Sequence, residues 1–263
     1  MKKSLNTSAL VTADSPKGQR VIETFRAQYN KAGLDDDSAQ CLNEHPGFAA
    51  YLAEGIRRFS MKAPDYGLAQ SILGTDLITP EEVTKARPSI VYSDEQITAL
   101  AESLPSEDVL KWCKENGYAV MPAPPQACSV LDVREIQSAH FYSKTGGRYA
   151  DQKFAREDKT SFGWMKIKKS PVSNSTSKTW DEQGELLSAL EKVPNAAEMC
   201  WFITTYFEVR GVRLFEGVYV RTSSLASDGY RVGVGRFDAR GLLVRDWFGA
   251  CRLDGIGLSV ARK

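Results

Sequence analysis

The sequence predicts an α+β protein, with helices in its first part and mostly strands in its last part. Amphipathic helical patterns recur up to Gly117, and a proline-rich stretch over residues 118–128 then interrupts them. After Gly211 only strand and turn patterns remain. Helices that precede a run of strands are the element order of an α+β fold.

The N-terminal region, residues 1–117, is predicted to be a small bundle of short helices. These helices are expected over residues 18–33, 46–60, 77–87, 93–104 and 106–117. In the first of them Val21, Phe25 and Tyr29 share one face, which is typical of an amphipathic helix. Thr79 is a typical N-cap for the third. This region shows no chemical motif.

Residues 118–263 are predicted to form one domain. A strand is expected over residues 161–172, helices over 179–193 and 194–211, and further strands over 212–215, 217–224, 230–237, 241–247 and 256–262. The first helix begins with a capping box from Thr179 to Glu182, and the second begins at Pro194 and ends at Gly211.

Composition narrows the classes of function. The 34 basic and 33 acidic residues give a net charge of +1, which provides no reason to expect binding to nucleic acid or to an anionic membrane. The five scattered cysteines suggest neither a disulfide framework nor a zinc site. No apolar run reaches the length of a signal peptide core or a membrane span. We therefore expect no metal, no cofactor and no membrane insertion.

Candidate catalytic residues are few. The two histidines, His45 and His140, lie near no nucleophile motif, so structural roles are favoured for both. Residues 144–149 contain two glycines but lack the spacing of a phosphate-binding loop, and a turn is the simpler interpretation. The sequence thus indicates no catalytic residue.

The C-terminal segment, residues 230–263, combines a regular apolar framework with irregular intervening residues. The framework positions are Val232, Val234, Phe237, Leu243, Val244, Trp247 and Ile256. From Gly217 to Arg262 the chain has no Lys, Glu, Gln or Met, although all four occur earlier. Strand propensity explains part of this bias, but exposed strand positions normally accept Lys and Glu.

Four stretches of the second half resemble formylglycine-generating, sulfatase-modifying enzymes, a branch of the C-type lectin fold. These stretches are residues 170–183, 193–206, 218–224 and 252–262. The resemblance covers roughly residues 126–263 and implies a C-type lectin-like domain over residues 118–263. Residues 194–198 and 257–259 depart from the family motifs, and the paired active-site cysteines are not evident. An enzyme of this type would have Cys200 and Cys251 available as its thiol pair.

The C-terminal segment is also similar to that of the variable proteins of diversity-generating retroelements, which use the same fold without catalysis. In that family, copying errors at adenines rewrite AAY codons, and they never produce Lys, Glu, Gln, Met or Trp. All residues at the intervening positions are reachable by this route. Trp247 is not, and it occupies a framework position. The resemblance implies a variable segment over about residues 230–255.

We expect the intervening positions to line a surface that binds a ligand, most simply a protein. The intervening positions are Tyr230, Gly233, Gly235, Arg236, Asp238, Arg240, Leu242, Arg245, Asp246, Phe248, Gly249, Ala250, Cys251, Leu253 and Gly255. Large Arg, Tyr and Phe side chains carry much of the energy of such interfaces. We further expect Trp247 and Ile256 to be buried, and Arg240 and Phe248 to be exposed.

Three alternatives remain at this point. The first is the formylglycine-generating type of enzyme, and the second is an ordinary lectin-like domain without diversification. The third is a nucleic-acid binder, since residues 229–263 hold six Arg and one Lys against three Asp, but the interspersed Asp residues argue against it. For the N-terminal helices the resemblance implies docking to a carrier. Because no signal peptide or membrane span is recognised in the sequence, we expect a location in the cytoplasm or in a phage particle.

Overall fold

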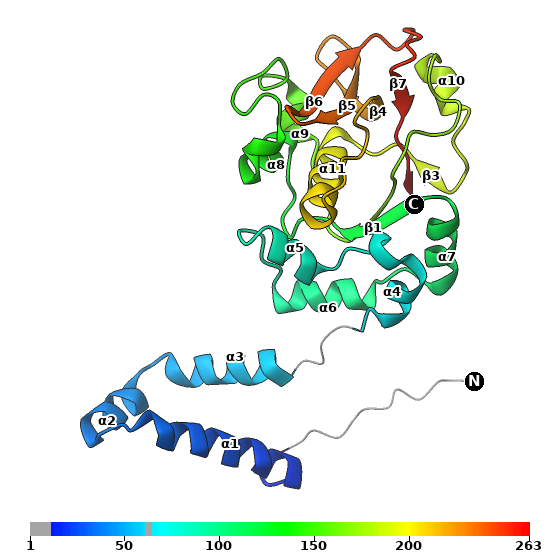
Figure 1. Cartoon of the computed structure of the whole chain (residues 1–263). Coiled ribbons are helices and arrows are strands. Elements are labelled where there is room, and N and C mark those ends of the chain that lie inside the picture. Colours follow the sequence, from blue (N-terminus) through cyan, green and yellow to red (C-terminus); the bar gives the residue numbers. More distant parts are fainter. Residues whose placement is uncertain (1–11, 61–64) are drawn as a thin grey trace. The chain divides into compact units, whose positions relative to one another are not determined.

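A computed structural model describes residues 12–60 and 65–263 (Figure 1). The chain divides into two compact units, residues 1–62 and residues 63–263. The described residues combine helices with two four-stranded sheets. The predicted α+β class is therefore confirmed.

The described residues of the N-terminal unit form three helices. They are α1 (Pro16–Ala32), α2 (Asp36–Glu44) and α3 (Phe48–Ser60). The side chain of Ser15 caps α1, and Gly33 ends it in the left-handed conformation, with a φ of 63°. The predicted apolar face of Val21, Phe25 and Tyr29 is exposed in the structure. This unit thus presents apolar side chains at its surface.

The second unit contains eight α-helices among its described residues. They are α4 (Gly67–Leu73), α5 (Pro80–Ala86), α6 (Asp94–Glu102), α7 (Glu107–Glu115), α8 (Val130–Ile136), α9 (Lys153–Glu157), α10 (Trp180–Gly184) and α11 (Ala196–Arg210). Two 3₁₀ turns, η1 (Gly74–Asp76) and η2 (Ser138–His140), accompany them. The predicted helix over residues 179–193 is shorter in the structure, because Glu191 and Lys192 pair with the C-terminal strand instead.

The strands of this unit form two sheets. They are β1 (Tyr118–Pro122), β2 (Trp164–Lys168), β3 (Glu191–Lys192), β4 (Tyr219–Leu225), β5 (Arg231–Asp238), β6 (Gly241–Trp247), β7 (Ile256–Leu258) and β8 (Ala261–Arg262). The strand orders are β1-β2-β8-β3 and β6-β5-β4-β7. Only the β4–β7 pair is parallel among the described strands. The predicted strand over residues 212–215 is a turn, in which Phe215 has a φ of 57°.

The boundary between the units lies after residue 62 and not after residue 117. Helices α4 and α7 pack with β1, β7 and Val260 in one apolar cluster. Strand β1 is buried on both faces, since Val120 enters this cluster while Met121 enters the main core. Ile78 N–H also donates to the Val120 carbonyl at 2.9 Å. The helices from residue 67 onward therefore belong with the sheets, because their apolar faces are buried against β1.

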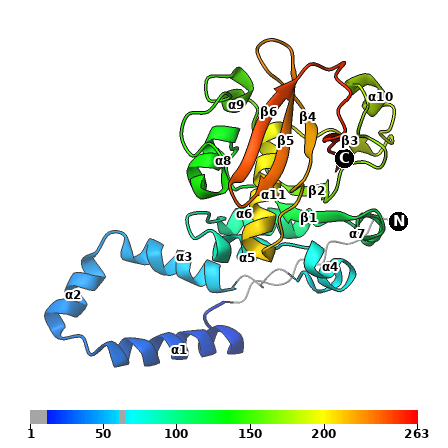
Figure 2. The same cartoon turned by 45° about the horizontal axis from the view of Figure 1, so that its top comes forward.

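Helix α11 lies at the centre of the main core, behind strands β4, β5 and β6 (Figure 2). It is buried on all sides over most of its length, and Trp201 Nε1 donates to the Pro122 carbonyl at 3.0 Å. Val220, Val234 and Val244 pack into the same core. We call the side of the β4–β6 strands that faces α11 the inner face, and the opposite side the outer face.

Candidate functional site

The C-terminal segment builds most of the outer face. Strand alternation and register assign to this face Tyr219, Arg221, Arg231, Gly233, Gly235, Leu243, Arg245 and Trp247. Gly233 lies opposite both Arg221 and Arg245, and Gly235 lies opposite both Tyr219 and Leu243. The glycines thus form the middle of the face, with larger side chains on either side.

Gly233 and Gly235 are buried and do not line a ligand surface, so the expectation for these two positions is wrong. A Cβ atom at Gly233 would lie 2.8 Å from the Trp247 ring, and one at Gly235 would lie 2.2 Å from the Val218 carbonyl oxygen. The Trp247 ring packs over this space, edge-on to Tyr219 at 4.6 Å between ring centroids. Gly233 therefore makes room for the Trp247 ring, and Gly235 makes room for the backbone of β4 and the residue before it.

Leu242 was also expected on the surface, but it is buried in the main core, with 1% of its area exposed. The pairing passes from Gly235–Leu243 to Asp238–Gly241, so β5 has one more residue than β6 in this interval. Residues alternate regularly along β6, so Leu242 and Val244 point inward and Leu243 points outward, while the bulge in β5 lets Phe237 point inward again. The predicted framework is correct for Ile256, which is buried, but Leu243 and Trp247 are only partly buried.

The guanidinium of Arg221 holds the loop that follows β6 against the outer face through hydrogen bonds. This guanidinium is buried and donates to the Lys178 carbonyl and to Gln183 Oε1, both at 3.0 Å, and to the Cys251 carbonyl at 2.7 Å. Burial lowers the pKa of Arg221. These bonds hold the loop around Cys251 against the segment that precedes α10.

Helix α10 holds the same loop through two further contacts. Trp180 N–H donates to the Gly249 carbonyl at 2.8 Å, and Arg252 pairs with Glu182 at 2.7 Å. The backbone N–H of Thr179 and the Arg252 guanidinium lower the pKa of Glu182 to about 2. The Arg231 guanidinium stacks on the Trp180 ring at 4.0 Å. The loop is thus a fixed part of the surface.

The remaining intervening positions are exposed or partly exposed. They are Tyr230, Arg236, Asp238, Arg240, Arg245, Asp246, Phe248, Gly249, Ala250, Cys251, Leu253 and Gly255. Tyr230 and Phe248 form an exposed aromatic pair with their ring centroids 5.8 Å apart. Arg240 pairs with Asp238 at 2.7 Å. Aromatic, cationic and anionic side chains thus lie exposed at the two ends of the β5–β6 hairpin and in the loop, and the predicted exposure of Arg240 and Phe248 is confirmed.

Sequence reasoning missed four residues of this surface: Arg231, Leu243, Trp247 and Arg252. The first three are partly exposed outer-face residues, and Arg252 is exposed in the loop. Strict alternation along β6, with Val244 inward, would have assigned Leu242 and Leu243 correctly. Nothing in the local sequence signals that Trp247 lies over a glycine of the neighbouring strand.

The thiols and histidines have structural surroundings. Cys200 is fully buried in α11, where burial raises the pKa of its thiol, whereas a reactive thiol needs a lowered pKa. Cys251 is partly exposed, and neither cysteine forms a disulfide. His140 bonds Glu208 within a cluster of aromatic rings, and His45 Nδ1 accepts from the Gly47 N–H at 3.2 Å. These surroundings do not favour the thiol-dependent enzyme.

No protein-family model, curated protein or solved structure matches this chain. Within the described residues, no group of three His, Cys, Asp or Glu side chains is placed to hold a metal ion. No described helix is long and apolar enough to cross a membrane. The interpretation of the site therefore rests on its own geometry.

Proposed function

We propose that residues 118–263 contain a C-type lectin-like domain, and that this protein is a non-catalytic variable protein of a diversity-generating retroelement. It binds its ligand through the outer face of the β4–β6 strands and the loop of residues 248–255. One observation carries the proposal: most of the exposed irregular side chains of the C-terminal segment lie on this face, at its ends or in its loop, while the opposite face of the same strands is a packed apolar core.

The layout of the surface supports a protein as the ligand. Phe248 and Tyr230 offer exposed aromatic area, and Arg236 lies over Tyr219, which packs against the partly buried Trp247. Aromatic and arginine side chains dominate the binding energy of protein interfaces. The loop is held by Arg221 and by α10, so its side chains are presented without a large ordering cost on binding.

The N-terminal unit is the part we propose for attachment to a carrier, such as a phage particle or a cell-surface assembly. Helix α1 has no buried residue within the chain, and Ile22, Phe25 and Tyr29 are exposed on it. An apolar helix face of this kind gains free energy when a partner covers it. Such a carrier would display the outer face of the second unit.

A library experiment tests the binding proposal. Arg236, Asp238, Arg245, Asp246 and Phe248 are randomised with NNY codons, and clones are selected against immobilised streptavidin as a chosen probe. We expect folded binders to appear, because exposed substitutions usually change the free energy of unfolding by within about 0.5 kcal/mol each. The matched control library randomises Val220, Val232, Val234, Phe237 and Val244 on the inner side and should give mostly unfolded clones.

Two outcomes would count against the proposal. If the first library unfolds as often as the control library, these side chains belong to the core and the surface is not variable. Sequencing the DNA around the gene tests the retroelement part separately. We expect a near-copy of the segment that encodes residues 230–255, differing at adenines, beside a reverse transcriptase gene. A surface library that works without such a copy would leave an ordinary lectin-like binding domain.

A further inference from the structure

The open part of the outer face lies along β6, at the edge of its sheet (Figure 2). Leu243, Arg245 and Trp247 point outward from this strand, and each is partly exposed. Alternate residues of a strand lie about 7 Å apart, so the arginine stands between two apolar side chains. On β4, by contrast, Tyr219 and Arg221 are buried. We call Leu243, Arg245 and Trp247 the β6 strip.

The guanidinium of Arg245 is unengaged. Among the residues that the structure describes, it makes no hydrogen bond, ion pair or aromatic contact. Its cross-strand neighbour is Gly233, which has no side chain to offer. A partly exposed guanidinium beside apolar side chains can bind an anion without first giving up another partner. Arg245 is therefore available to a ligand.

Arg236 is a second available cation. Its side chain is exposed, and its guanidinium lies over the Tyr219 ring at 5.4 Å. Within the described chain it has no hydrogen bond or ion pair through this guanidinium. The Trp247 ring packs against the same tyrosine, with 4.6 Å between the ring centroids. One aromatic ring thus connects Arg236 to the β6 strip.

The acids of the C-terminal segment do not compensate these two arginines. Asp238 is engaged by Arg240, whose guanidinium lies 2.7 Å from its carboxylate. Asp246 pairs with Val232 across the strands, so its side chain leaves β6 on the side opposite to Arg245. The outer-face residues assigned by strand register include three arginines and no acid. The open face therefore has positive charge around an apolar centre.

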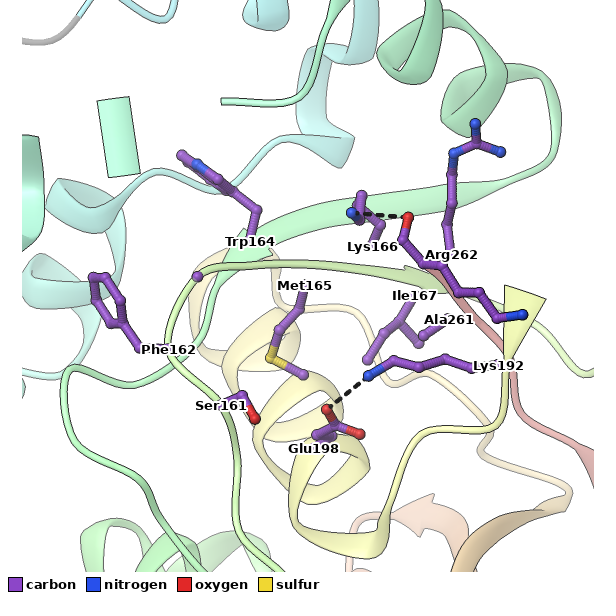
Figure 3. A pocket seen from close by; sticks show the side chains of 12 residues that line it. Ser161, Phe162, Trp164, Met165, Lys166, Ile167, Lys192, Glu198, Ala261 and Arg262 are labelled. Atoms are coloured by element: carbon purple, nitrogen blue, oxygen red, sulfur yellow. Dashed lines mark hydrogen bonds and ion pairs between the residues drawn. The ribbon is translucent and has the colours of Figure 1, made fainter. Parts of the chain in front are cut away.

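A second group of cations, around β2, differs from this one. There a pocket of about 400 Å³ is lined by Lys166, Lys192 and Arg262 (Figure 3). Lys192 pairs with Glu198 at 3.5 Å, and the Arg262 guanidinium stacks on the Trp112 ring at 4.3 Å. Lys192 provides a matched control for Arg245, because it belongs to β3 in the other sheet and already has a carboxylate partner.

We propose that the β6 strip and Arg236 bind an acidic segment of a partner protein, with one carboxylate on Arg245, another on Arg236 and an apolar side chain on Trp247. The inference rests on the proposed function of the outer face and specifies the chemistry of its ligand. A guanidinium binds a carboxylate through two parallel hydrogen bonds. The same positive charge disfavours basic partners, because like charges that meet across an interface cost several kcal/mol.

A nucleic acid fits this surface less well than an acidic protein segment does. Its phosphates recur along the whole backbone, so binding needs a continuous path of cations. Asp246 follows Arg245 in β6, and Asp254 lies in the loop of residues 248–255; both are exposed and interrupt such a path. A protein segment, by contrast, can place single carboxylates at two arginines.

Peptide selection on the full chain tests the charge of the ligand. A phage library of random dodecapeptides is panned on the immobilised wild type, on Arg245→Glu and on Lys192→Glu. On the wild type and on Lys192→Glu, we expect Asp and Glu to be enriched at least about twofold over the naive library. On Arg245→Glu this enrichment should disappear, because the new carboxylate repels acidic peptides.

Fluorescence anisotropy then measures the affinity of the most enriched acidic peptide, labelled with fluorescein. Arg245→Gln and Arg236→Gln should each weaken binding by about tenfold, the scale of one lost charge pair. Lys192→Gln should leave the affinity unchanged. Added salt should weaken binding to the wild type, because it screens the charge pairs. Urea denaturation of each variant checks that a loss of binding does not come from unfolding.

The other outcomes overturn the inference in distinguishable ways. If selected peptides lose binding to Phe248→Ala but carry no excess of acid, the acidic ligand is wrong and the binding proposal stands. Acidic peptides that bind Arg245→Glu but not Lys192→Glu would place the site around β2. Tighter, Arg245-dependent binding of labelled oligothymidine would assign the surface to nucleic acid. If no selected peptide depends on Arg245 or Phe248, the inference and the proposed binding surface are both wrong.

Discussion

The two faces of the β4–β6 strands have the same backbone but opposite requirements for their side chains. On the inner face, Val232, Val234 and Phe237 pack against α11 with almost no exposed area. On the outer face, Arg231 stacks on Trp180, and Arg236 lies over Tyr219 at 5.4 Å. A change of side-chain volume on the inner face is expected to destabilise the core, whereas changes at the exposed outer positions are expected to cost little stability. The difference shows that sequence irregularity is possible where only one side of a residue is packed.

The largest expected effect comes from a matched pair of phenylalanines. Phe237, on the inner side, is 1% exposed, and Phe248, beyond the end of β6, is 57% exposed. Phe237→Ala should lower the free energy of unfolding by about 3–5 kcal/mol, because it leaves a cavity in the main core. Phe248→Ala should change it by less than about 0.5 kcal/mol. Urea denaturation measures both, and similar losses for the two variants would mean that the faces are not distinct.

A second pair sharpens the comparison within the C-terminal segment, because both residues are glycines. A Cβ atom at Gly235 would clash with the Val218 carbonyl, and the φ of 151° is unfavourable for other residues, whereas one at Gly249 would lie 3.6 Å from Trp180 Cβ. Gly235→Ala should therefore cost about 1–3 kcal/mol through overpacking. Gly249→Ala should be nearly neutral. Thermal melts of both variants check this, and a neutral Gly235→Ala would restore this position to the variable surface.

Local patterns in the sequence were enough to predict most elements but not how they pack. The N-cap at Thr79 and the capping box at Thr179 are present as predicted, since a cap depends on four neighbouring residues only. The unit boundary was misplaced because the contact between α7 and β1 depends on tertiary packing. For the same reason the burial of Gly233 could not be predicted, since it depends on where the Trp247 ring lies.

The loop of the outer face should respond to acid through Glu182. Its pKa is lowered in the folded protein from an ordinary 4.5 to about 2 by the Thr179 N–H and by Arg252. Because the pKa of Glu182 is lower in the folded than in the unfolded protein, its negative charge stabilises the fold. This contribution is complete above about pH 4.5 and is lost as the pH falls toward 2. Glu182→Gln keeps the helix cap but removes the charge. The difference in unfolding free energy between the wild type and Glu182→Gln should therefore be constant at neutral pH and shrink below pH 4.5.

Denaturation at a series of pH values measures this difference. Glu216→Gln, at an exposed position in the turn before β4, is the control and should show no comparable change. If the wild type is more stable than Glu182→Gln by the same free energy at pH 2 as at neutral pH, the Glu182 carboxylate does not hold Arg252 in solution.

The smallest expected effect concerns Arg236, the residue at which the bulge of β5 turns outward. Its φ of 45° is in the left-handed region, which costs most residues about 1–2 kcal/mol but costs Asn less, because its short side chain bonds the local backbone. Arg236→Asn should therefore raise the free energy of unfolding by up to about 1 kcal/mol, although it removes the contact with Tyr219. Arg240→Asn, at an exposed position without a positive φ, should bring no such gain. If urea denaturation gives equal free energies of unfolding for the two variants, the backbone at Arg236 is not strained. In that case neither packing nor backbone conformation restricts which residue can occupy position 236.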